Sequence, residues 1–292
     1  MTTTAILADW ELDYYSRPVL EPDGKKRWEL LICSSPTLDP SQPLFRWSEA
    51  CAAGSVNSAW LKGALERALT DAEKGGFAPP RRLRCWRASM RTMVQRAAEQ
   101  LDLELVPSRR CFALVEWLRE RHLEVYPQEE GYLAGPLAPP PTPIQPLAVP
   151  LPEAVRGDSW SWASLPVGEL REAAQWPIGF SGLVGLPAGL EEGFPVPGLR
   201  LFSRARALAI AGWLAGLEPV RLEISGQQLV LEAGIDARWL LANLEAEEAA
   251  AARQAFRDAR EQAGGVQFIA VQASESDPRF EGFWLLRDLP DS

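Results

Sequence analysis

The sequence predicts a mixed α/β (α+β) protein of two similar-sized halves joined by a proline-rich linker. In each half, strand-like runs alternate with amphipathic helical segments, which indicates helices packed on sheets. Residues 134–152 contain eight prolines and no charged residue, and this composition favours polyproline II over a helix or a central strand. We therefore divide the 292-residue chain into an N-terminal domain, 1–130, a linker, 131–157, and a C-terminal domain, 158–292.

The first half opens with two strand-like runs in residues 10–33, WELDYYSRPVLEPDGKKRWELLIC. The Asp23-Gly24 pair between the runs is a hairpin signal. Ser55 or Asn57 caps the helix that follows, and Ser89 caps the second helix. The predicted order after the hairpin is a helix over 55–76, a strand over 82–86, a helix over 90–101, a strand over 103–106 and a helix over 110–126.

The second half has a similar alternation of predicted strands and helices. Its predicted elements are a strand over 198–202, a helix over 203–217, a hairpin over 221–233 that turns at Ser225-Gly226, a helix over 245–265 and closing strands over 266–274 and 280–290. Placing Leu83 over Leu199 aligns a strand, a helix and a second strand in the two halves. This alignment suggests an internal duplication.

Composition excludes several classes of protein. No apolar run reaches the roughly 18–20 residues that cross a bilayer, and the N-terminal MTTTAILADWELD lacks the features of a secretory signal, so we expect a cytoplasmic protein. The four cysteines are widely spaced and form no CxxC pair. A single histidine, His122, excludes most imidazole-based metal sites, and we expect neither a metal nor a cofactor.

Arginine is concentrated in residues 81–111, although the chain carries a formal net charge of -9. Arg84 leaves a predicted strand, Arg87 and Arg91 share one face of the next helix, and Arg109 and Arg110 begin the following helix. Connections after consecutive parallel strands meet at one sheet edge, where arginines and helix N-terminal amides bind phosphate. The alternative is a solvated helix surface that pairs locally with the three acidic residues of the segment, Glu99, Asp102 and Glu104.

Two further basic clusters lie at turns. Lys25, Lys26 and Arg27 occupy the hairpin tip, and Arg204 and Arg206 lie at a helix start in the second half. Single-stranded RNA is held by phosphate contacts and by stacking of bases on aromatic rings. The aromatic candidates for stacking are Tyr14, Tyr15, Trp86, Trp160 and Trp162, although most tryptophans in proteins are core residues.

A metal-dependent nuclease is an alternative function. Asp9, Glu11, Asp13 and Glu29 lie on adjacent predicted strands and resemble the carboxylates that hold Mg²⁺ in nucleases. Such sites need a lysine two residues beyond the strand carboxylate, where this chain has Leu31. The pattern therefore favours binding over catalysis.

Several segments in order resemble the Tab/Atab family of RNA-binding proteins: WELDYYSRPVLEPDGKKRWELLIC, WRASM, LVPSRRC, PGLRLFSRARALAIAGWLAGLE and GFWLLRDLP. The resemblance implies a non-catalytic activator that binds A/U-rich 5′ leader RNA and supports translation of photosystem reaction-centre subunits, notably of photosystem I. It also implies a function for the basic residues of the first half and for the tripeptide Trp284-Leu285-Leu286, although FWLL is equally typical of a half-buried strand.

The resemblance leaves two further expectations. Chloroplast members of the family carry an import extension that this sequence lacks, so it is similar to a cyanobacterial member. The rival function is a protein-binding assembly factor for photosystem biogenesis, without RNA contact, that docks through an apolar surface at FWLL or on the alanine-rich helix. Translation or assembly factors are further candidate partners, and the oligomeric state does not follow from the sequence.

Overall fold

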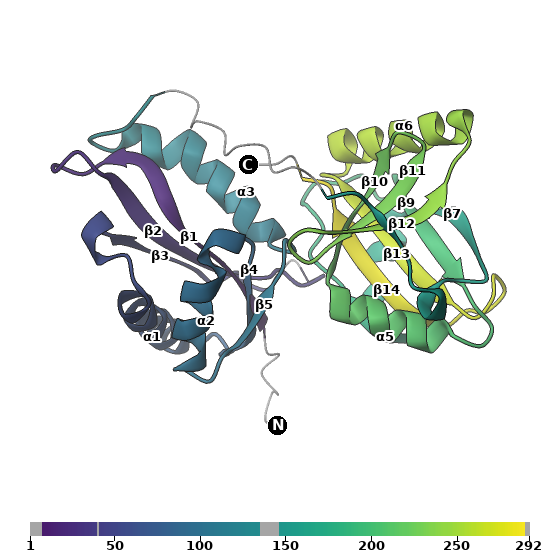
Figure 1. Ribbon diagram of the computed structural model, residues 1–292, viewed down its shortest axis with the longest axis horizontal. Helices are drawn as coiled ribbons and strands as arrows, with labels where there is room; N and C mark the ends of the chain where they lie inside the picture. Colours follow the sequence, from purple (N-terminus) through teal and green to yellow (C-terminus); the bar gives the residue numbers. More distant parts are fainter. Residues whose placement is uncertain (1–7, 40, 135–145, 290–292) are drawn as a thin grey trace. The chain divides into compact units, whose positions relative to one another are not determined.

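The protein forms two compact units, each built from strands and helices. The structure is a computed structural model that describes residues 8–39, 41–134 and 146–289 (Figure 1). Among the described residues, the first unit comprises 8–35 and 43–134, and the second comprises 36–39, 41–42 and 146–289. The predicted mixed α/β class is confirmed.

One mixed sheet forms the centre of the first unit. Its strands, in spatial order, are β3 (Arg46–Cys51), β2 (Lys26–Ser34), β1 (Ala8–Leu20), β4 (Pro80–Cys85) and β5 (Glu104–Pro107). β1, β2 and β3 form an antiparallel meander, and Gly24 takes the left-handed φ of 79° in the first turn. β4 runs parallel to β1, and β5 runs parallel to β4. The carboxyl ends of β4 and β5 therefore lie at one edge of the sheet, while β1 continues past them.

Helices cover both faces of this sheet (Figure 1). Trp10, Leu12 and Tyr14 are at alternate positions of β1, so their side chains lie on the same face of the sheet. This face packs against two helices, α1 (Ser58–Lys74) and α2 (Arg91–Glu99). The opposite face packs against α3 (Phe112–Glu120), which contacts Leu31 and Cys33 of β2 and continues as a π-helical turn, Arg121–Val125. Asn57 caps α1 by accepting the Trp60 amide, as predicted, whereas α2 has no side-chain cap.

Charged residues, rather than apolar ones, fill much of the layer between β1 and α3. Glu11, Asp13 and Arg17 of β1 are at most 2% exposed, and Glu29 of β2 is 6% exposed. Ionisable groups are buried at this depth when hydrogen bonds and opposite charges compensate for lost hydration, or when the group is neutral. The contacts that do so determine the geometry of the candidate site below.

Two sheets form the second unit. One contains, in spatial order, β10 (Pro219–Ser225), β11 (Gln228–Ala233), β12 (Ala237–Asn243) and β6 (Val149–Pro150). The other contains β7 (Ser159–Pro166), β9 (Pro195–Phe202), β13 (Val266–Gln272), β14 (Phe280–Arg287) and β8 (Ile178–Gly182). The predicted hairpin turns at Ser225 and Gly226, and the predicted closing strands correspond to β13 and β14.

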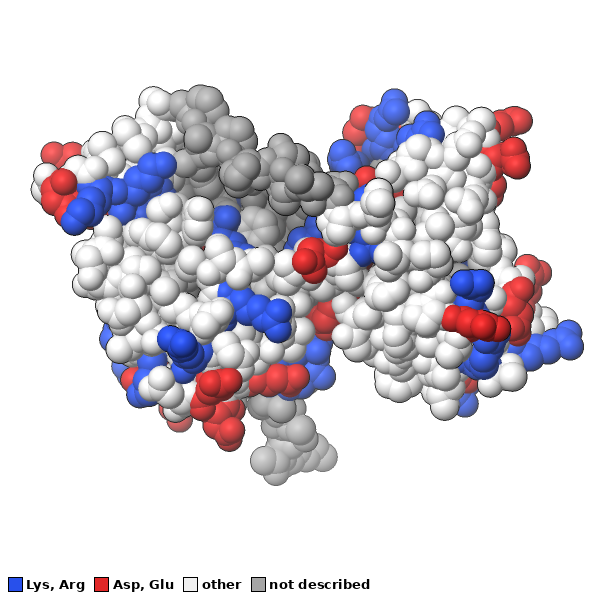
Figure 2. Space-filling view, viewed as in Figure 1, with Lys and Arg blue, Asp and Glu red and all other residues white. Residues whose placement is uncertain are grey.

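Three α-helices accompany these sheets, α4 (Val167–Arg171), α5 (Ala207–Leu217) and α6 (Ala246–Gln262). The core lies between α5, α6 and both sheets, with Ile210, Leu222, Phe256 and Ile269 among its buried residues. α5 carries no charged residue, Leu208 on it is 57% exposed, and the surface over this helix is largely white in Figure 2. Protein surfaces that bind nucleic acids are cationic, so this face of the second unit is a poor candidate for such a surface.

The predicted linker, 131–157, is partly built into the two units. Tyr132 forms a bridge with Val19 of β1, and the Leu133 amide donates to the Pro18 carbonyl. After the undescribed residues 135–145, Val149 and Pro150 pair with β12 at a sheet edge, a position where proline is tolerated.

The internal duplication suggested by the alignment is not found in the sheets. β4 pairs in parallel with β5, which follows it across α2. In the second half, the two aligned strands, β9 and β10, lie in different sheets, and β9 pairs instead with β7 and β13. Similar local patterns therefore pack into different topologies.

Candidate nucleic-acid interface

The arginine-rich segment surrounds the carboxyl edge of the sheet in the first unit. Leu12 of β1 is opposite Cys85 of β4, and Cys85 is opposite Pro107 of β5. The Ser108 amide donates to the Cys85 carbonyl at 3.1 Å, so the connections that follow β4 and β5 begin side by side. This confirms that the two arginine-containing connections share one sheet edge.

A buried carboxylate, Asp13, organises this edge. It accepts hydrogen bonds from Arg17 Nη1 at 2.8 Å, Trp86 Nε1 at 2.8 Å and Arg87 Nε at 2.5 Å. Burial by itself would raise the pKa of Asp13, but the guanidinium groups of Arg17 and Arg87 outweigh that effect and hold the pKa below its ordinary value. Asp13 therefore stays ionised and fixes the side chains that reach it.

Arg87 lies against two aromatic rings. Its guanidinium carbon is 4.1 Å from the ring centroid of Tyr15 and 4.5 Å from that of Trp86. Both rings are half-buried, and the Arg87 side chain is 22% exposed. We call Tyr15, Trp86 and Arg87 the edge stack. Cation–π contacts of this length are attractive, and the guanidinium plane and rings form one connected stacking group.

Arg91 extends the basic character of this edge towards solvent. It is the first residue of α2 and is exposed. Arg96, in the last turn of the same helix, is also exposed. Arg109, in the connection after β5, is half-buried.

Two of the predicted phosphate-binding residues are buried, which corrects the expected rim. Arg84 is 5% exposed and forms an ion pair with Asp9 at 2.8 Å. Arg110 is 3% exposed and its guanidinium lies 5.5 Å from the Phe112 ring centroid. Both face the interior because side chains alternate along a strand and rotate around a helix start, so sequence proximity does not give a common face.

The predicted basic hairpin tip is exposed in part. Lys25 and Lys26 are exposed, and Lys25 forms a surface ion pair with Asp23. Arg27 is half-buried and pairs with Glu21 and Glu129. Because two carboxylates already neutralise Arg27, the tip presents the two lysines rather than three positive charges.

In the second unit, a carboxylate occupies the place where a phosphate was expected. Asp158 accepts hydrogen bonds from the Ser203 hydroxyl, the Arg204 amide and Arg206 Nη2, just before α5 begins. These bonds, led by that of Arg206, hold the pKa of Asp158 below its ordinary value. Arg206 is therefore engaged within the unit, while the Arg204 side chain is exposed.

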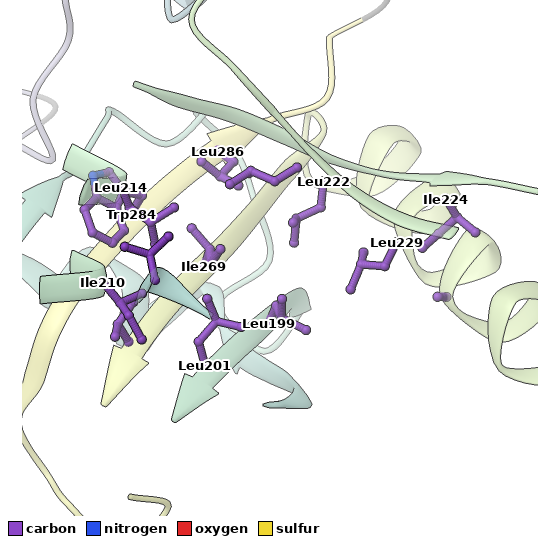
Figure 3. Close-up of a cluster of buried hydrophobic side chains, with 14 of the residues drawn as sticks. Leu199, Leu201, Ile210, Leu214, Leu222, Ile224, Leu229, Ile269, Trp284 and Leu286 are labelled. Atoms are coloured by element: carbon purple, nitrogen blue, oxygen red, sulfur yellow. The ribbon is translucent and has the colours of Figure 1, made fainter. Parts of the chain in front are cut away.

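The tripeptide Trp284-Leu285-Leu286 is buried on both faces of β14, not half-buried. Its residues are 3%, 0% and 0% exposed, and Trp284 and Leu286 belong to the core of the second unit beside Leu214 and Ile269 (Figure 3). A residue inside a close-packed core contacts other core atoms rather than a ligand. The structure thus assigns the tripeptide a packing role, and it removes FWLL as an apolar docking surface.

The carboxylates considered for a nuclease site are each bound by protein groups. Asp9 pairs with Arg81, Arg82 and Arg84, while Glu29 accepts from Arg17, Arg121 and the Tyr126 hydroxyl. Glu11 accepts the Leu114 amide in the first turn of α3 and the Ser35 hydroxyl. Within residues 8–39, 41–134 and 146–289, no group of three His, Cys, Asp or Glu side chains is arranged to hold a metal ion.

Comparison with known proteins identifies the family. A family profile described as "RNA-binding protein Tab2/Atab2 N terminal" matches residues 9–121, and one described as "RNA-binding protein Tab2/Atab2, C-terminal domain" matches residues 139–287. The chain belongs to the Tab2/Atab2 family of RNA-binding proteins.

Two relatives of the Tab2/Atab2 family are similar along most of the chain. A Zea mays protein named "Protein TAB2 homolog, chloroplastic" is 34% identical over 97% of this chain and 72% of its own length. An Arabidopsis thaliana protein of the same name is 32% identical over 97% of this chain and 75% of its own length. No solved structure matches the chain. The helices of the described residues include none that is long and apolar enough to cross a membrane.

Sequence reasoning missed the residues that position the edge stack in this Tab2/Atab2 protein. Asp13 was considered only as a metal ligand, and Arg17 was not considered. The signal was present, because Glu11, Asp13, Tyr15 and Arg17 recur at a spacing of two within a strand, which places them on one face. A charged face on a strand beside an arginine-rich segment indicates an ion-pair layer.

Proposed function

We propose that the protein binds single-stranded, A/U-rich 5′ leader RNA and thereby supports translation of photosystem reaction-centre subunits, those of photosystem I in particular, without catalysing a reaction. The observation that supports this most strongly is that both halves match family profiles described as RNA-binding. The chloroplast proteins that share the similarity are named as TAB2 homologues, in keeping with a role in photosynthetic gene expression.

We further propose that phosphates bind at the carboxyl edge of the first unit. Arg91 is exposed on the first turn of α2, in the same connection after β4 as the half-buried Arg87. Lys25 and Lys26 add exposed charge at the β1–β2 turn, and blue and red groups are interspersed over this unit in the view of Figure 2. A few cations among carboxylates favour a small number of phosphate contacts over general polyanion binding.

The test is a salt titration of binding between purified protein and a fluorescent A/U-rich single-stranded RNA. Three to five phosphate contacts would give a slope of log affinity against log salt of about -2 to -4, at roughly 0.7 per contact. Arg91→Glu should weaken binding and flatten the slope by at least about 0.7. Arg96→Glu is the matched control, because it reverses an exposed charge on the same helix away from the edge.

Equal effects of Arg91→Glu and Arg96→Glu would remove the edge as the phosphate site. Absence of binding by folded wild-type protein at low salt would overturn RNA binding and favour the rival, a protein-binding photosystem assembly factor. Loss of RNA that requires Mg²⁺ and stops with EDTA would instead indicate a nuclease. The cytoplasmic location, the cyanobacterial origin and protein partners stay predictions.

A further inference from the structure

We propose that the edge stack, Tyr15, Trp86 and Arg87, is the binding site for one unstacked base of the bound RNA. The inference rests on the proposed RNA-binding function and adds to it the place where a base, rather than a phosphate, is held. Single-stranded RNA is recognised through splayed bases that stack on aromatic rings or on guanidinium planes. The edge stack joins both kinds of surface in one group.

Partial exposure together with a guanidinium over the ring distinguishes this group; among the other aromatic candidates Tyr14 is buried, while Trp160 and Trp162 are half-buried like Tyr15 and Trp86. Tyr14 is 0% exposed and donates to the Cys51 thiol inside the core, so no base can reach it. Trp160 and Trp162 pack against the core of the second unit, where Trp162 Nε1 donates to Glu248 of α6. Tyr15 and Trp86 combine partial exposure with a guanidinium beside their rings.

The edge stack is held in place before any ligand arrives. Asp13, which is fully buried, accepts from both Trp86 Nε1 and Arg87 Nε, and Arg17 holds Asp13 from the other side. A surface arginine ordinarily loses much rotamer freedom when it binds, and this cost is reduced here because folding has already immobilised the side chain. A base that stacks on Arg87 therefore binds with higher affinity than it would on a mobile arginine.

The position of the edge stack in the fold also suits a nucleotide. It lies beyond the carboxyl end of β4, beside the part of β1 that continues past Leu12, at the end of parallel strands where open α/β sheets bind ligands. Arg91 follows Arg87 by four residues, after one short 3₁₀ turn, Ala88–Met90. Arg91 therefore adds an exposed cation to the same connection after β4 that carries Trp86 and Arg87.

The experiment compares Tyr15→Leu with Tyr15→Phe, using an A/U-rich single-stranded RNA in which 2-aminopurine replaces one adenine per molecule in a scan of positions. In wild-type protein, one position should lose fluorescence when its base stacks. Tyr15→Leu should abolish that loss and weaken binding about 5- to 100-fold, since base–aromatic stacking contributes on this scale. Tyr15→Phe keeps the ring and should bind within about twofold of wild type.

The salt slope separates this subsite from the phosphate contacts. Tyr15→Leu should leave the slope of log affinity against log salt unchanged, whereas Arg91→Glu flattens it. A measurement on wild-type protein keeps the inference testable if Tyr15→Leu does not fold. RNA that contains 4-thiouridine should cross-link, on irradiation, to a peptide containing Tyr15 or Trp86.

The outcomes distinguish the two proposals. If wild-type protein binds the RNA but Tyr15→Leu leaves affinity and quenching unchanged, the edge stack does not bind a base, while the proposed RNA-binding function stands. Cross-links confined to peptides that lack Tyr15 and Trp86 lead to the same conclusion. If folded wild-type protein does not bind the RNA at all, the proposed function is wrong, and so is the proposed base-binding site.

Discussion

Glu11 shows how burial alters the chemistry of a single residue. Burial raises the pKa of its carboxyl to about 7, although hydrogen bonds from the Leu114 amide and the Ser35 hydroxyl and the charge of Arg84 act in the opposite direction. In the folded protein Glu11 therefore holds a proton at pH values where the same group in the unfolded chain, with an ordinary pKa of 4.5, has lost it.

This difference makes folding depend on pH. Between about pH 4.5 and 7 the folded state binds more protons than the unfolded state, so the contribution of Glu11 to stability falls as pH rises through this window. Relative to Glu11→Gln, wild-type protein should lose up to about 3 kcal/mol of unfolding free energy between pH 4.5 and 8. Urea denaturation of both proteins across this pH range measures this loss of unfolding free energy. A constant difference between the two would show that Glu11 is ionised throughout.

Arg17 is the central cation of the buried layer. It is 2% exposed and donates to Asp13 at 2.8 Å and to Glu29 at 3.1 Å. Arg17→Met leaves two buried carboxylates with less compensation, and it should cost about 3–5 kcal/mol. Arg27→Met is the control, because Arg27 also pairs with two carboxylates but is 25% exposed, and its loss should cost less than about 1 kcal/mol.

Urea unfolding of the Arg17→Met and Arg27→Met variants provides the comparison. Equal losses would mean that the buried layer admits water and screens its charges like a surface. A loss confined to Arg17→Met would also predict weakened RNA binding, since Arg17 positions Asp13 and, through it, the edge stack.

At the scale of elements, β14 illustrates a motif whose role depends on its neighbours. β14 pairs with β13 and β8, and α5 covers the side on which Trp284 lies. Gly282 leaves room for the Trp284 ring, because a Cβ at this glycine would lie 2.4 Å from Trp284 Cη2. The strand is therefore adapted to seat the indole inside the core.

Trp284→Ala should destabilise the second unit by about 3–5 kcal/mol, because it removes a large side chain and leaves a cavity. Leu208→Ala, on the exposed side of α5, should change stability by no more than about 0.5 kcal/mol. Circular dichroism during urea unfolding measures both. Wild-type stability of Trp284→Ala together with lost RNA binding would contradict the packing role and restore a functional role to the tripeptide.

In the described part of the chain, each of the two units has its own buried apolar residues. Trp10, Leu30 and Leu61 belong to a core of the first unit, and Leu199, Phe256 and Leu286 belong to that of the second. Units with their own cores can unfold separately. The Arg17→Met and Trp284→Ala substitutions should therefore shift different transitions of the intact chain, each leaving the other in place. A single transition that both substitutions shift equally would show that the units unfold as one.

The sequence by itself determined the features that depend on local periodicity. Helices such as 55–76 and 245–265 and the hairpin at Asp23-Gly24 were predictable, because amphipathic spacing and turn residues act within a few positions. The shared edge of the two arginine-containing connections was also predictable, since parallel strands align their carboxyl ends. β3, β6, β7, β8 and β12 were missed, and β6 and β7 pair with partners distant in the sequence, β12 and β9.

Only the tertiary structure decided which residues reach solvent. Arg84 and Arg91 are the same residue type in one segment, yet Arg84 is buried against Asp9 and Arg91 is exposed. Their difference depends on what packs against each position from elsewhere in the chain. The edge stack likewise exists because β1 brings Asp13 and Tyr15 beside Trp86 and Arg87, about 73 residues away. Burial and long-range pairing are properties of the assembled fold, so local sequence does not encode them by itself.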